Sequence, residues 1–155
     1  MENTIDITTA TQYPENRLKP TEPHSFRLDN KTCCSLESIL QAMKFRNVRD
    51  QQLICSAPAQ IARLKGKKVN WKTNQKLYWN GTEYRRDSEE YQTLLDNIIN
   101  ALSTNMGFMS SLNASTAESF ICSELGDDPT QTPMTSEEYC SRIISLRIPS
   151  ATNEE

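Results

Sequence analysis

Apolar residues recur at the three- and four-residue spacing of a helix in several stretches of the chain, and each stretch predicts a helix with one buried face. The first runs from Ser35, a natural N-cap, to Phe45. A second begins at Arg49 and ends near Gly66, and Pro58 is expected to divide it into two short helices. Later helices are predicted for residues 88–102, 106–112 and 135–147.

Patterns typical of strands are fewer. Residues 25–34 alternate apolar and polar side chains around the turn signal Asp29-Asn30, which predicts a small β-hairpin. Residues 75–84 are rich in aromatic side chains and suit a helix or an irregular segment. Residues 117–125 are ambiguous, because Phe120 and Ile121 suit a buried strand. We therefore expect a mainly α fold: one multihelical domain with a small N-terminal β-hairpin or minor sheet.

Both ends of the chain lack this periodicity. Residues 1–23 are rich in Thr, Pro and Asn and are expected to form an extended or flexible N-terminal arm. Residues 150–155 are polar and are expected to form a flexible tail. Residues 24–149 then form the single domain, a length that can bury one core.

Composition narrows the classes of function. The net charge of −3 argues against a dominant nucleic-acid-binding surface. No apolar run reaches the roughly 20 residues of a membrane helix, and the first residues lack the features of a signal peptide. Five cysteines, without zinc-site spacing, indicate reduced thiols in a cytoplasmic protein. A lone histidine, His24, nearly excludes a His base or a set of His ligands, and we expect no metal or other cofactor.

The first predicted helix carries the strongest candidate site. Glu37, Gln41 and Lys44 lie at i, i+4 and i+7, which places them on one stripe beside the apolar stripe. Such a stripe is more often a solvated helix face. It can also form the wall of a cleft, in which the carboxylate acts as acid, base or stabiliser of an oxocarbenium ion. The amine of Lys44 would then be a nucleophile or a phosphate clamp.

A basic segment with aromatic residues follows. Between Arg63 and Arg86 lie eight of the chain's 17 basic residues and one acid, Glu83. The segment is either a solvated basic face or a rim that binds phosphate. Trp71 lies within it and is either a core residue or a platform for stacking a base.

A late acidic turn contains Asp127 and Asp128, followed by Pro129. The local sequence favours a loop stabilised by Asx-turn hydrogen bonds. The functional alternative is a pair of carboxylates that hold ribose hydroxyls.

The pattern Glu37-x-x-x-Gln41-x-x-Lys44, entered from a hairpin that ends in Ser, resembles the signature of the NADAR superfamily, the YbiA-like proteins. Residues 54–66, Asn70-Trp71, residues 91–97 and a final helix ending at Arg147 are similar to that family in the same order. The resemblance covers residues 25–148. Two features depart from the family: Ser38 stands where it often has His, and GDDPTQTPMT stands near the place of its late Asp-x-x-Trp-Gly motif.

The resemblance implies an N-glycosidase that cleaves an ADP-ribosyl or phosphoribosyl compound, such as ADP-ribose on guanine. The implied partners are small molecules or nucleobases so modified, including ADP-ribosylated DNA. Glu37 and Lys44 would be catalytic and Gln41 would orient the ribose. The remaining binding residues would be Trp71 over the pocket and Arg63 or Lys65 at the phosphate. The alternatives are a non-catalytic module that binds ADP-ribose or a related nucleotide, and a helical interaction protein.

Overall fold

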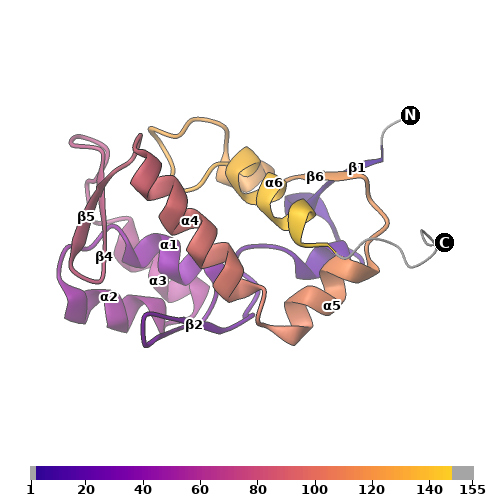
Figure 1. Ribbon diagram of the computed structural model, residues 1–155, viewed down its shortest axis with the longest axis horizontal. Coiled ribbons are helices and arrows are strands. Elements are labelled where there is room, and N and C mark those ends of the chain that lie inside the picture. Colours follow the sequence, from indigo (N-terminus) through magenta and orange to yellow (C-terminus); the bar gives the residue numbers. More distant parts are fainter. Residues whose placement is uncertain (1–2, 148–155) are drawn as a thin grey trace.

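A long amphipathic helix, α4 (Glu89–Leu102), runs across the computed structural model, which describes residues 3–147 (Figure 1). Three short helices lie on one side of it and two on the other. The first group is α1 (Leu36–Ala42), α2 (Val48–Cys55) and α3 (Ala59–Gly66). The second group is α5 (Met106–Ala114) and α6 (Ser136–Leu146). Short 3₁₀ turns occur at Ile7–Thr9, Glu15–Arg17 and Ser123–Leu125.

Helices α1, α4 and α6 begin where the sequence predicts, and at each of these starts a side chain caps the helix. Ser35 accepts a hydrogen bond from the amide of Ser38 at α1, and Ser88 accepts one from Tyr91 at α4. Thr135 opens α6 with a full capping box. Pro58 separates α2 from α3, as predicted.

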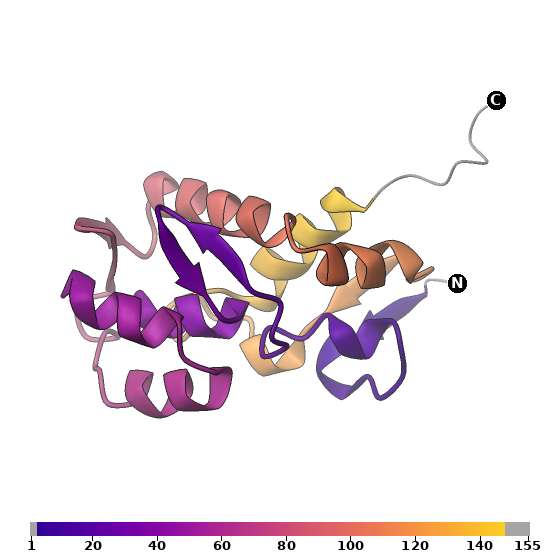
Figure 2. The same ribbon diagram turned by 90° about the horizontal axis from the view of Figure 1, so that it is seen from below.

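Six short strands form three separate two-stranded sheets within residues 3–147. The strands β2 (Phe26–Leu28) and β3 (Lys31–Cys33) form the predicted hairpin, with Asp29 and Asn30 in the left-handed conformation of its turn. β2 contacts α4, and β3 contacts α2 (Figure 2). The other two sheets pair β4 (Lys76–Trp79) with β5 (Thr82–Arg85), and β1 (Thr4–Asp6) with β6 (Ser119–Ile121).

The prediction of a mainly α fold is wrong, because the fold is mixed α/β, with 46% helix and 14% strand among residues 3–147. The clearest omission is the β4–β5 hairpin, which occupies residues that suited a helix or an irregular segment. Its turn is Asn80-Gly81, with φ of 52° and 90°. An Asn-Gly pair between two runs rich in aromatic residues is a strong hairpin signal, so the sequence did contain the necessary information.

The N-terminal residues differ from the extended or flexible arm expected for residues 1–23. From Asn3 onward they pack against the body, and β1 pairs in parallel with β6 (Figure 1). Ile7 and Leu18 have no exposed surface and belong to the core. The apolar residues here are too few and too widely spaced to show periodicity, which is why the sequence pattern missed them. The tail predicted from residue 150 lies outside the described residues.

Helix α4 supplies much of the core through one continuous apolar face. The buried side chains on this face are those of Tyr91, Leu94, Leu95, Ile98, Ile99 and Leu102. Tyr91 also donates a hydrogen bond to the carbonyl of Pro133, which ties the late loop to the helix. Among the helices of residues 3–147, none combines the length with the apolar composition that a membrane crossing requires.

A buried ion pair joins Arg86, in the turn before α4, to Glu138 of α6. Arg86 is 3% exposed, and its guanidinium donates two hydrogen bonds to Glu138, at 2.6 and 3.1 Å. Burial alone would raise the pKa of Glu138, but hydrogen bonds from Arg86, from the Thr135 amide and from Gln92 lower it overall. The carboxylate is therefore held in its charged form.

Replacing Glu138 by Gln should destabilise the fold by about 3 kcal/mol, because Arg86 then keeps its charge in a buried site without a counter-ion. Glutamine preserves the length of the side chain and can still complete the capping box. Urea unfolding measures the change at neutral pH. Since the lowered pKa makes the contribution of Glu138 disappear as pH falls through that pKa, the two proteins should become equal in strong acid. Arg85→Gln, which removes an exposed arginine, is the control and should leave the midpoint unchanged. An unchanged midpoint in both variants contradicts the prediction.

Candidate functional site

A cleft of about 440 Å³ opens between α1, α3 and the late part of the chain. Helix α1 contributes Glu37, Leu40 and Gln41, and Lys44 follows just after it. Helix α3 contributes Arg63, and Lys67 comes directly after that helix. The opposite wall consists of Glu124, Leu125, Gln131, Thr132 and Pro133.

Glu37 is the buried carboxylate of this cleft, with 5% of its surface exposed. The Gln41 amide donates a hydrogen bond of 2.7 Å to it, and the Arg63 Nε donates one of 3.1 Å. Both end on Oε2, which leaves Oε1 for water or a ligand. Glu37 therefore does not lie on a solvated helix face; it is a charged group held in place from two directions.

Arg63 connects two carboxylates across the cleft. Its Nε bonds to Glu37, and its Nη2 lies 3.5 Å from Glu124 on the far wall. Burial alone would lower the pKa of Arg63, but the two carboxylates raise it overall. Arg63 is therefore a counter-ion that stays charged between the two acids.

Gln41 is positioned by a glycine on the neighbouring helix. A Cβ at Gly66 would overlap Oε1 of Gln41 and lie 2.8 Å from its Cδ. The absence of a side chain at Gly66 thus lets Gln41 lie flat against α3 and reach Glu37. Oε1 of Gln41 is buried and has no hydrogen-bond partner within residues 3–147, an arrangement that costs about 1–3 kcal/mol.

Lys44 lies at the end of the cleft and is half-buried. Burial lowers its pKa below the ordinary value for lysine. The negative charge of Glu37 acts in the opposite direction, and the positive charge of Lys72 adds to the lowering. The amine of Lys44 is therefore neutral at a lower pH than that of a solvated lysine, which favours nucleophilic chemistry.

A second pocket of about 260 Å³ adjoins the cleft, and Lys44 lines both. Its other charged residues are Arg46 and Lys76. Its aromatic residues are Phe45, Trp71 and Tyr78, and the rest of its lining is Val69, Asn70 and Asn74. It contains no acidic residue among the described lining.

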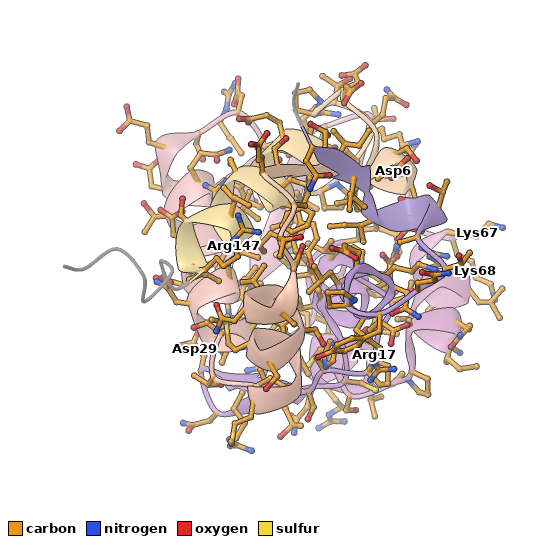
Figure 3. The ribbon with its side chains drawn as sticks, turned by 90° about the vertical axis from the view of Figure 1, so that its right-hand side faces the viewer. Asp6, Arg17, Asp29, Lys67, Lys68 and Arg147 are labelled. Carbon is orange, nitrogen blue, oxygen red and sulfur yellow. The ribbon has the colours of Figure 1, made fainter. Side chains whose placement is uncertain are left out.

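The structure separates the predicted phosphate residues Arg63 and Lys65. Arg63 lines the cleft, whereas Lys65 is exposed and does not. Lys67 lines the cleft instead of Lys65, because it lies four residues after Arg63 and so shares its side of the helix. Figure 3 shows Lys67 and Lys68 at one edge of the molecule.

The predicted stacking residue Trp71 is 3% exposed and lines the second pocket. Its burial agrees with the alternative of a core residue, and its place in the pocket keeps it within reach of a ligand's edge. It does not line the cleft that contains Glu37.

The two late aspartates lie outside the cleft. Asp128 accepts hydrogen bonds from the amide and hydroxyl of Thr130, at 2.9 and 2.8 Å, which is the Asx-type turn that the local sequence favours. Asp127 lines a different pocket, beside Phe120 and Cys140. The residues that follow this turn, from Gln131 to Pro133, do line the cleft.

Glu124 is the charged residue of the opposite wall, none of whose residues the sequence predicted. It lies 87 positions after Glu37, and only the tertiary structure brings the two together around Arg63. Its one available signal was its place just before the acidic turn.

Within residues 3–147 no group of three or more His, Cys, Asp or Glu side chains is arranged to hold a metal ion.

Comparison with known proteins gives one family. A family model described as bacteriophage protein GP30.3 matches residues 12–148. Neither the curated proteins nor the solved structures contain a match. The resemblance to the NADAR superfamily is therefore wrong, because the matching family is a different one. The residues that suggested it, Glu37, Gln41 and Lys44, follow a spacing that any short amphipathic helix bordering a cleft can adopt.

Substituting Gly66 by Ala should displace Gln41 and destabilise the protein by about 1–3 kcal/mol, since the new methyl overlaps the amide. The double variant Gly66→Ala/Gln41→Ala should recover most of that loss, because the overlapping atoms are then absent. Urea unfolding of the two single variants and the double variant measures the coupling. Strictly additive losses would show that the two residues do not meet.

Substituting Glu37 by Gln should lower the pKa of Lys44 further, because it removes the charge that raises it. Reductive methylation with ¹³C-formaldehyde followed by an NMR titration reports this pKa directly. Asp128→Asn removes a carboxylate outside the cleft and should leave the titration of Lys44 where it is. A rise in the pKa of Lys44 in Glu37→Gln would contradict the cleft electrostatics.

Proposed function

The chain belongs to the bacteriophage GP30.3 protein family, and we propose that it hydrolyses the N-glycosidic bond of an ADP-ribosyl or phosphoribosyl compound, such as ADP-ribose on guanine. The observation that carries the proposal is the pair formed by Glu37, a buried and fixed carboxylate, and Lys44, an amine with a lowered pKa. The cleft volume of about 440 Å³ suits a ribose with a phosphate or a base.

Glu37 would act on the developing positive charge at C1 of the ribose. Cleavage of an N-glycosidic bond passes through an oxocarbenium-like state, which a fixed carboxylate stabilises. In the hydrolytic route Oε1 of Glu37 takes a proton from a water molecule whose oxygen attacks C1. The electron pair of the C1–N bond passes to the base, which then accepts a proton.

Lys44 offers a covalent route through the same cleft. Its neutral amine would attack C1 and expel the base together with the bonding electron pair. Transfer of the amine proton to the ring oxygen opens the sugar and leaves an imine between Lys44 and C1. Water then adds to the imine, restoring the amine and releasing the sugar as an aldehyde.

Gln41 and Arg63 would position the reacting groups. Gln41 holds Glu37, and its buried acceptor Oε1, which has no partner within residues 3–147, can be satisfied by a ribose hydroxyl once the amide rotates. Arg63 fixes the carboxylate of Glu37 through their direct ion pair. For the compartment we propose the cytoplasm, since the cysteine pattern fits neither a disulfide framework nor a zinc site.

A non-catalytic binding module is the second candidate, and one observation favours it. Arg63 pairs with both Glu37 and Glu124, and two carboxylates that line one cleft are well suited to accept hydrogen bonds from ribose hydroxyls. Calorimetric binding of ADP-ribose without release of base from any ADP-ribosylated nucleobase would favour this candidate over the enzyme.

The separate variants Glu37→Gln and Lys44→Ala should each reduce release of guanine from ADP-ribosylguanine, by about 10²–10⁴-fold in kcat/KM, as expected for loss of a reacting group. Chromatography of the released base measures this. Lys65→Ala changes a lysine of α3 outside the cleft lining and should retain the parent rate.

Borohydride added during turnover separates the two chemical routes. A trapped sugar adduct that is lost in Lys44→Ala indicates the imine, and cleavage without an adduct indicates attack by water. Full activity in both Glu37→Gln and Lys44→Ala would refute the assignment of the reaction to this cleft.

A further inference from the structure

The cleft and the second pocket meet at the side chain of Lys44, which lines both. We infer that the two spaces bind one substrate, with its ribose in the cleft and a phosphate-bearing extension in the second pocket. The substrate class is then a riboside joined through a diphosphate to a second nucleoside, rather than a ribose monophosphate. This inference rests on the proposed function.

The distribution of charge orients such a substrate. The cleft contains the carboxylates of Glu37 and Glu124, which accept hydroxyl donors and offset much of the positive charge of Arg63, Lys44 and Lys67 in the same lining. The described lining of the second pocket is cationic, with Lys44, Arg46 and Lys76 and no acid. A diphosphate is therefore favoured in the second pocket and the sugar hydroxyls are favoured in the cleft.

Arg46 is the main candidate for the phosphate. Among residues 3–147 Arg46 has no ion-pair partner, and its planar guanidinium can bond two phosphate oxygens at once. Lys76 already lies 3.3 Å from Glu83 and would contribute less. The position of Arg46, two residues after Lys44, places the phosphate next to the amine that also faces the ribose.

The size and surface of the second pocket fit more than one phosphate. About 260 Å³ exceeds the space that a single phosphate occupies, and the half-buried rings of Phe45 and Tyr78 offer apolar surface beyond the cations. A nucleoside linked through a diphosphate has an anionic part for Arg46 and a planar base for these rings. A ribose monophosphate would leave the aromatic side of the pocket without a partner.

The experiment measures binding and cleavage separately. ADP, which carries the diphosphate and its nucleoside but lacks the second ribose, is the calorimetric probe for the second pocket. Arg46→Gln should weaken ADP binding about tenfold or more, while Arg27→Gln, an exposed arginine that lines neither space, should bind ADP as the parent does. Cleavage is compared on ADP-ribosylguanine and on the matched 5′-phosphoribosylguanine, with about tenfold higher kcat/KM expected for the former.

The outcomes distinguish this inference from the proposed function. Equal cleavage of both substrates, with ADP binding unaffected by Arg46→Gln, overturns the inference and leaves the glycosidase intact. Loss of ADP binding in Arg46→Gln without cleavage of either substrate supports the second pocket and refutes the glycosidase. A tenfold preference for the diphosphate substrate that disappears in Arg46→Gln supports both.

Discussion

A buried carboxylate must have partners, and that requirement organises the half of the molecule that contains the cleft. Glu37 lies on a short helix whose residues are all buried, so its charge must be stabilised by protein groups, one from its own helix and one from the neighbouring helix α3. Arg63 supplies the opposite charge, and Gly66 supplies the space in which Gln41 can approach Glu37. The packing of α1 against α3 and the geometry of the cleft are thus one arrangement, and neither can change without the other.

Local signals in the sequence were sufficient for most helices and for one of the three sheets. The caps Ser35, Ser88 and Thr135 and the break at Pro58 act within a few residues, so a linear pattern contains them. The hairpin at Asn80-Gly81 was equally local and was missed because aromatic residues suit several structures. The parallel pair of β1 and β6 could not be predicted, because its two strands have no local relation in the sequence.

The site was predictable to a similar extent. Spacing alone placed Glu37, Gln41 and Lys44 together, and helical periodicity would have chosen Lys67 over Lys65 beside Arg63. Glu124 and the second pocket depend on tertiary contacts among segments that the sequence does not relate. The pKa of Lys44 is lowered by burial and by the charge of Lys72, against the opposing charge of Glu37, and the sequence does not show that burial.

The pairing of β1 with β6 also has a consequence for the order of events on the ribosome. Thr4 meets Ser119, a partner 115 residues later in the chain. During synthesis β1 therefore has no partner strand, and the side chain of Ile7 cannot reach its buried place, until residues 119–121 have been made. Contacts of such long range slow folding, so the beginning of this chain is among the last parts to reach its native place.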